Sequence, residues 1–271
     1  MDRQVIDGYL DPAPALALAG VLGVDPPDVE AGDPLPLLWH GAYLLPAAAQ
    51  SELGPDGHPR DGVPSPPAPG LRRMFASGSV ASMRALRFGA PARRTTELVG
   101  TTTRTGRSGT LIFASVRSTI EQDGEVAVVD DQTLVYREPS GPAGPAPEPA
   151  PLPPIPPDAS ARTVELDPVL LFRFSALTYN AHRIHYDRDY ATGVEGYPGL
   201  LVHGPLQALL MIELARAQAG RPIERFEYRL SAPLFDGQSA RISALPGADG
   251  IATAVHGAAG QLTASGLAVP Q

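Results

Sequence analysis

The side chains best suited to acid–base chemistry are gathered in one polar segment in the second half of the chain, which contains Asn180, His182, Arg183, His185 and Asp187. Imidazole exchanges protons near neutral pH, and a side-chain amide can hold a water molecule. A guanidinium can bind a carboxylate or a phosphate through two parallel hydrogen bonds. This combination predicts a site that moves protons on a polar or anionic substrate.

A helix is predicted directly after this segment. A Gly/Pro hinge at 195–199 leads to His203-Gly204-Pro205, and proline fits the first turn of a helix because its missing N–H would have no partner there anyway. Gly220 suits the end of the helix. The apolar face is formed by Leu206, Leu209, Leu210, Ile212 and Leu214. The first backbone N–H groups of such a helix are unpaired, so they can stabilise negative charge that develops beside the polar segment.

Composition narrows the classes of partner and chemistry. The 271 residues include 29 acidic and 21 basic ones, and the formal net charge of -8 argues against nucleic acid or an anionic membrane as a partner. Every basic residue is arginine, so an anionic ligand must be met by Arg, His or backbone N–H groups. The sequence has no cysteine, which excludes thiolate catalysis and Cys-ligated metals. No apolar run could span a bilayer and the N-terminus lacks a signal peptide's apolar core, so we expect a cytoplasmic protein.

The order of elements indicates two diverged copies of one fold. Each half is expected to contain one central helix and a run of strands, with helices of the first half at 1–26 and 33–47. The expected strands are 72–78, 80–87, 95–105, 110–121, 126–137, 225–232, 238–245, 251–256 and 261–268. A Pro-rich linker at 139–160 divides an N-terminal unit, 1–138, from a C-terminal unit, 161–271, and no residue-level repeat is visible between them. The C-terminal unit is expected to carry the active site, and the N-terminal unit to be non-catalytic and to supply only a wall of its pocket. A helix covered by antiparallel strands is an α+β arrangement.

The polar segment and the start of the helix resemble a known family. The string TYNAHRIHYD, followed by Tyr190-Ala191 and His203-Gly204, is similar to the MaoC-like, R-specific enoyl-thioester hydratases. The longer pattern, which continues with EGYPGLLVHGP, resembles a narrower branch, the double hot-dog hydratases of mesaconyl- or itaconyl-type CoA esters and their 3-hydroxyacyl-thioester dehydratase relatives. Weaker matches lie at 34–39 and 72–78. The resemblance implies an α+β double hot-dog, in which two antiparallel sheets each wrap a central helix, and an acyl-CoA substrate without a cofactor.

The resemblance also implies catalytic roles for Asn180, His185 and Gly204. The wider family has an acidic residue at the position of Asn180, whereas the narrower branch shares the Asn, so His185 is the only base of the pair. His185 is expected to deprotonate a water held by Asn180 and to return the proton to the α-carbon, which would be a syn addition. Gly204 would let the thioester approach the backbone N–H groups of the helix.

Five further residues are predicted to bind the substrate. Arg183, Tyr197 and His203 are expected around the acyl group, with Arg183 clamping a carboxylate, while Arg72 and Arg73 are expected to meet CoA. Each has a structural alternative. Arg183 could be an ordinary ion-pair partner, His203 a core or capping residue, and the two neighbouring arginines the solvated end of a strand.

Two alternative roles concern the polar segment itself. His182, His185 and Asp187 could bind a metal ion, but they lack fixed helical spacing and a clear further ligand, so no metal is expected. Asn180 could instead serve a turn, a position that asparagine favours.

The sequence therefore predicts a hydro-lyase that reversibly hydrates an α,β-unsaturated acyl-CoA, with mesaconyl- or itaconyl-CoA as the first candidate substrates. A 3-hydroxyacyl-thioester dehydratase of fatty acid or polyketide type is the alternative within this class. A thioesterase is less well supported, because the helix offers no carboxylate before Glu213. A non-catalytic acyl-thioester-binding protein is the alternative of another class. A fused double unit holds both sheets in one chain, so a monomer or a homodimer is expected.

Overall fold

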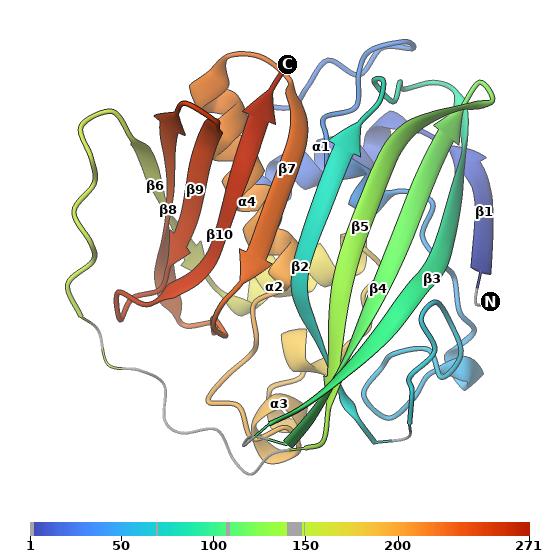
Figure 1. Ribbon diagram of the computed structural model, residues 1–271, viewed down its shortest axis with the longest axis vertical. Coiled ribbons are helices and arrows are strands. Elements are labelled where there is room, and N and C mark those ends of the chain that lie inside the picture. Colours follow the sequence, from blue (N-terminus) through green and yellow to red (C-terminus); the bar gives the residue numbers. More distant parts are fainter. Residues whose placement is uncertain (1–2, 69, 107–108, 140–147, 149) are drawn as a thin grey trace.

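A ten-stranded antiparallel sheet with helices against one face forms the framework of the protein (Figure 1). The computed structural model describes residues 3–68, 70–106, 109–139, 148 and 150–271. The strands are β1 (Arg3–Tyr9), β2 (Arg72–Ser82), β3 (Pro91–Gly106), β4 (Gly109–Gln122), β5 (Glu125–Arg137), β6 (Ser160–Leu166), β7 (Ile223–Leu230), β8 (Gln238–Gly247), β9 (Gly250–His256) and β10 (Leu262–Pro270). The α-helices are α1 (Pro12–Leu22), α2 (Pro168–Leu177), α3 (Arg188–Gly193) and α4 (Gly204–Ala219).

The two halves of the sheet have the same topology. From its outer edge inward, the first half runs β1-β3-β4-β5-β2 and the second runs β6-β8-β9-β10-β7. The innermost strands, β2 and β7, pair with each other in antiparallel fashion, with Val80 opposite Phe226. Both of these side chains are fully buried. The two expected antiparallel sheets therefore join into one continuous sheet (Figure 1).

A short sequence repeat marks equivalent positions in the two halves. Leu10-Asp11-Pro12 and Leu166-Asp167-Pro168 both stand where an edge strand gives way to a helix. The two aspartates cap their helices, accepting a backbone hydrogen bond from Ala13 at 2.9 Å and from Leu170 at 2.7 Å. The leucines are buried. No residue-level repeat stands out in the sequence, because a match of three residues gains meaning only when the structure shows that the two positions are equivalent.

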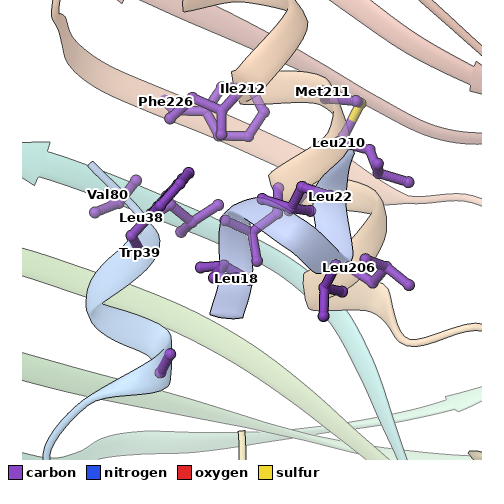
Figure 2. Close-up of a cluster of buried hydrophobic side chains, with 14 of the residues drawn as sticks. Leu18, Leu22, Leu38, Trp39, Val80, Leu206, Leu210, Met211, Ile212 and Phe226 are labelled. Carbon is purple, nitrogen blue, oxygen red and sulfur yellow. The ribbon is translucent and has the colours of Figure 1, made fainter. Parts of the chain in front are cut away.

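Helix α4 is the central helix of the second half and packs against β7 to β10. It opens at Gly204-Pro205 and ends at Gly220, whose φ of 62° is left-handed, as the sequence predicted. Figure 2 shows leucines of α1 lying beside apolar side chains of α4 and of the segment around Trp39. Each large side chain buried in this way contributes about 1.5–3 kcal/mol to folding relative to being exposed. This core fixes the start of α4 in space.

The first half has no comparable central helix within the described residues. Of the segment 33–47, only a short 3₁₀ turn, η1 (Trp39–Ala42), is helical, so the predicted helix was wrong. Pro34 and Pro36 remove backbone donors and disfavour helical conformation in the residues before them. Leu38 and Leu44 have positive φ values of 75° and 50°, which interrupt a helix on either side of the turn.

Other boundaries also differ from those expected. The first 26 residues form an edge strand and a helix rather than helices alone, because β1 pairs with β3 along its whole length. In place of the two strands expected at 72–78 and 80–87 there is the single strand β2, which ends at Ser82, and β6 was not expected. The division at the 139–160 linker stays a prediction, since 140–147 and 149 lie outside the described residues. No helix in the described ranges is long and apolar enough to cross a membrane.

Candidate active site

A cavity of about 510 Å³ opens at the N-terminus of α4 and is lined by residues of both halves. Asn180, His182 and His185 of the polar segment line it, as do Gly204 and Pro205 at the start of the helix. The first half supplies His58, Arg73, Phe75, Gln132, Leu134 and Arg137. The three residues with predicted catalytic roles are therefore brought together in one cavity.

Asn180 lies in a tight turn that directs its amide into the cavity. Its backbone N–H donates to the Ser175 carbonyl at 2.8 Å, and the preceding residue, Tyr179, has a φ of 50°. Its Oδ1 accepts a hydrogen bond from the backbone N–H of His182 at 3.0 Å. This bond fixes the orientation of the amide and leaves the NH₂ group for a ligand. The two roles considered for Asn180, a turn residue and a water-holding residue, are compatible.

The ring of His185 is held with one nitrogen turned away from the protein backbone. Its Nδ1 lies 2.6 Å from the carbonyl oxygen of Leu201, so Nδ1–H donates and Nε2 carries the lone pair. Burial lowers the pKa of His185 from 6.5 to about 4, against the opposing effect of the Leu201 hydrogen bond and with a further lowering by His58. His185 is therefore a neutral base at neutral pH.

His203 lies behind His185 rather than in the cavity. The two rings stack with centroids 3.7 Å apart and planes 19° apart. The Nε2 of His203 is 2.8 Å from the Ser175 hydroxyl, and the side chain is fully buried. Burial, followed by the proximity of His185, holds the pKa of His203 well below its usual value. This geometry indicates that His203 helps to position the His185 ring, whereas the sequence predicted that His203 contacts the substrate.

The start of α4 presents unpaired backbone donors close to His185. The side chain of His203, the N-cap residue, makes no capping hydrogen bond, because it is turned toward Ser175. Gly204 is also tightly enclosed: a Cβ there would lie 3.3 Å from the Phe75 ring and 3.4 Å from Leu230. The first-turn N–H groups are left for an anionic or partly charged ligand oxygen.

The predicted substrate-binding arginines lie in three different environments. Arg183 does not line the cavity: it pairs with Asp187 at 2.7 Å, donates to the Pro55 carbonyl at 3.0 Å and lies over the Tyr190 ring. Arg72 pairs with Glu195 at 2.6 Å. Only Arg73, with the predicted residue Tyr197, lines the cavity.

Asp56 and His58 are candidate site residues that sequence reasoning missed. The Nδ1 of His58 lies 3.0 Å from an Asp56 carboxylate oxygen, and its ring centroid is 4.0 Å from that of His182. Asp56, His58 and His182 place potential metal-ligand atoms within 4.8 Å of one another. Asp187, named in the predicted metal alternative, instead accepts from the Tyr190 N–H and caps α3. In the sequence, His58 appears only in an Asp-Gly-His triplet within a polar loop. Such a triplet does not indicate an active-site residue unless the position of the loop is known.

Two sheet halves of the same topology packed against a central helix are typical of the double hot-dog class, and solved structures with this likeness align over the whole chain. A MaoC-like dehydratase from Phytophthora capsici superposes with a TM-score of 0.71 and 17% identity, covering 100% of this chain and 96% of its own. A conserved hypothetical protein of Mycobacterium tuberculosis, described as having a double hot-dog fold, gives 0.59 and 16%, with 100% and 97% covered. These likenesses confirm the predicted fold class.

Sequence comparison identifies the family. Residues 38–236 match the family model of hydroxyacyl-thioester dehydratase type 2. The mesaconyl-C(4)-CoA hydratase of Chloroflexus aurantiacus is 51% identical over 239 residues, which cover 88% of this chain and 85% of that protein. The chain belongs to the hydroxyacyl-thioester dehydratase type 2 family and is a hydro-lyase acting on acyl thioesters. The predicted enzyme class is confirmed.

Proposed function

We propose that this protein reversibly hydrates a small, branched enoyl-CoA that carries a second, free carboxylate, of the mesaconyl- or itaconyl-CoA type. The observation that carries the proposal is Arg73, a cation on the wall of the acyl cavity. Within the described part of the chain Arg73 forms no ion pair, whereas Arg72 and Arg183 are both paired. The 51% identical relative is named for a substrate of this kind.

Arg73 is suited to select a carboxylated acyl chain. Burial lowers its pKa, with Tyr136 and Asp56 opposing that change, so the guanidinium is incompletely solvated yet remains charged at neutral pH. A substrate carboxylate would replace the missing hydration with a charge-assisted hydrogen bond. An uncharged acyl chain of the same size would leave the cation without that partner. We therefore assign the binding of the substrate carboxylate, predicted for Arg183, to Arg73, which was expected to bind CoA.

The remaining residues fit the chemistry of hydration. The thioester carbonyl is placed at the first turn of α4, where N–H donors stabilise the enolate oxygen. The NH₂ group of Asn180 holds the water, and Nε2 of His185 takes its proton as the oxygen adds to the β-carbon. The developing enolate raises the pKa of His185 and makes it a stronger base during the reaction than in the empty site. A second proton transfer, to the α-carbon, completes the hydration.

A matched pair of variants tests the substrate proposal. Arg73→Gln should lower kcat/KM for mesaconyl-CoA by about 10²-fold or more, the value of a charge-assisted hydrogen bond of roughly 3 kcal/mol. Its effect on crotonyl-CoA, which has no second carboxylate, should be small. Arg183→Gln should affect both esters equally, since Arg183 lies outside the cavity. The measurement is the loss of enoyl-thioester absorbance. Equal losses of both substrates in Arg73→Gln would contradict the proposal.

The proposal also covers the cellular location and the oligomeric state of the protein. The protein is proposed to act in the cytoplasm, as a monomer or a homodimer. Pairing of β2 with β7 joins the two sheets within one chain, so a site lined by both halves needs no second copy. Full specific activity that persists on dilution to a monomer, measured with light scattering, would support the monomeric state. Activity lost together with a dimer would contradict it.

A further inference from the structure

A loop of the first half is docked onto the polar segment of the second. The backbone carbonyl of Asp56 accepts from the N–H of Arg183 at 2.9 Å, and the carbonyl of Pro55 accepts from the Arg183 guanidinium at 3.0 Å. Gly57 has a φ of 90°, and a Cβ there would overlap the carbonyl of Ala181. Only glycine permits both this conformation and this approach. The loop is therefore held in one place relative to the catalytic segment.

The docked loop brings a carboxylate–imidazole pair to the cavity. Asp56 Oδ2 lies 3.0 Å from Nδ1 of His58, an arrangement in which Nδ1–H donates and Nε2 remains available. His58 lines the cavity together with His182 and His185. Its ring lies 4.0 Å from that of His182, which is 5.5 Å from that of His185. Three imidazoles thus form one wall, and within the described part of the chain only that of His58 is hydrogen-bonded to a carboxylate.

Hydration requires two proton transfers, one at the water and one at the α-carbon. Asn180 cannot carry a proton, and Nε2 of His185 already faces the water. We propose that His58, oriented by Asp56, is the second acid–base group of the site and gives the proton to the α-carbon. This inference rests on the proposed function and assigns a chemical role to the first half, which was expected to supply only a wall.

The proposed step is balanced as follows. The oxygen of water bonds to the β-carbon while His185 Nε2 takes one of its protons. The electron pair of the double bond moves through the α-carbon to the thioester oxygen. The enolate then takes a proton from His58 Nε2, which leaves His58 neutral. His185 releases its proton to solvent and His58 regains one, so the net change is the addition of one water. In dehydration His58 removes the α-proton and Asp56 stabilises the resulting imidazolium.

The charges around His58 support a group that gains and loses a proton. Burial lowers its pKa, the Asp56 hydrogen bond raises it, and Arg73 lowers it again. His182 also faces it, and its own pKa is lowered by burial and then by His58. A substrate carboxylate bound at Arg73 would offset the effect of Arg73 and raise the pKa of His58. Binding of the correct substrate would therefore charge the proton donor.

Asp56, His58 and His182 could instead hold a metal ion, but the hydrogen bond between Asp56 and His58 argues against it. Nδ1 of His58 and one oxygen of Asp56 are directed at each other at 3.0 Å. A metal bound by this nitrogen would displace the proton that joins them. Dialysis against a chelator should therefore leave activity unchanged. Loss of activity that Zn²⁺ restores would assign the cluster to a metal and overturn the inference.

Exchange of the α-hydrogen of the hydroxyacyl-CoA with D₂O, followed by mass spectrometry, separates the two bases. His58→Gln should lose both net hydration and α-exchange by about 10²-fold or more, with little change in KM. His185→Ala should lose net hydration yet keep α-exchange, because His58 removes that hydrogen. His256→Gln, on β9 and outside the cavity, is the control and should change neither. Exchange kept in His58→Gln and lost in His185→Ala would overturn the inference while leaving the proposed function in place.

Asp56→Asn tests the positioning role and does not depend on how well a His58 variant folds. Without the carboxylate the pKa of His58 falls, so its protonated form is lost at lower pH. The basic limb of the hydration profile should move to lower pH, with about a tenfold loss of rate above that limb for each unit of change. A profile identical to that of the unaltered protein would overturn the inference. No hydration of any enoyl-CoA by the unaltered protein would instead refute the proposed function.

Discussion

The two halves of this chain share one sheet topology and differ in the connection that runs beneath it. In the second half the connection from α2 to β7 contains the polar segment and the 16-residue helix α4. In the first half the connection from α1 to β2 contains the 3₁₀ turn η1 and a long loop. One copy thus provides a helix N-terminus with a base beside it. The other provides Arg73 and the Asp56–His58 pair to that same site.

The difference shows that the two halves can keep the same strand order while the segments that connect their helices to the sheet acquire different functions. A helix N-terminus can stabilise an enolate only where its donors are unpaired, and the described residues offer such a helix end beside an imidazole only at α4. Because the first half has no central helix in its described residues, the connection between α1 and β2 is free to form a loop that contacts the polar segment of the second half. Changes in the two halves should therefore have different effects on rate, binding and stability.

The largest effect should come from His185 in the second half. His185→Ala should reduce hydration by 10²–10⁴-fold, the usual value of one acid–base group, because no other base faces the water. The measurement is loss of enoyl-thioester absorbance, with His256→Ala as a control and a thermal melt to confirm folding. Substantial activity in His185→Ala beside an inactive Asn180→Ala would mean that another residue deprotonates the water.

A smaller effect is expected at Asn180. Asn180→Ala should lose up to about 10²-fold through a misplaced water, because the base itself is retained. Asn180→Asp should retain more activity than the alanine variant, since a carboxylate oxygen can still accept from the His182 N–H. The added charge should raise the pKa of neighbouring His185 and move the acidic limb of the pH–rate profile upward. An alanine variant as inactive as His185→Ala would show that holding the water matters as much as the base, and would contradict this ranking.

Gly204 tests the start of α4 with a single added methyl group. Gly204→Ala should raise KM about tenfold, the equivalent of about 1.4 kcal/mol of lost binding, because its Cβ would lie 3.3 Å from Phe75 where the thioester must approach. The matched control is Gly193→Ala at the end of α3, where the added methyl meets nothing within 4 Å. Equal KM values for both variants would mean that the thioester does not lie against the start of α4.

The smallest effect concerns stability in acid. The pKa of His185 is about 4 in the folded protein and 6.5 as its ordinary value, so the unfolded chain binds more protons between these pH values. The free energy of unfolding should therefore fall as pH decreases from 6.5 toward 4. His185→Asn should reduce that slope by at most about 1.4 kcal/mol per pH unit. Denaturant unfolding at a series of pH values measures it, and an unchanged slope would contradict the assigned pKa.

Local patterns predicted those parts of the fold that depend on local interactions. Alternating apolar residues placed β4, and Pro205 with Gly220 placed both ends of α4. The edge strands β1 and β6 were missed because they are seven residues long and largely exposed along one side. The helix expected around Trp39 failed because apolar composition was given more weight than the flanking prolines.

The site could be predicted only where its residues are close in sequence. Asn180, His185 and Gly204 belong to one segment and its following helix, so their placement in one cavity followed from the motif. Asp56 and His58 reach that cavity by docking onto residues more than 100 positions away, which no local pattern indicates. Arg183 was given a ligand role for its charge, but the long-range contact with Pro55 makes it a support for the docked loop.

The central claim is that the two halves build one active site, and the number of ligands bound per chain tests it most directly. Titration calorimetry with a saturated, carboxylated CoA thioether, which cannot react, gives this number for the unaltered protein. One ligand per 271-residue chain is predicted, with binding weakened by Arg73→Gln although Arg73 belongs to the first half. Two ligands per chain, of which only one is affected by this substitution, would show that the first half has a site of its own and would contradict the account.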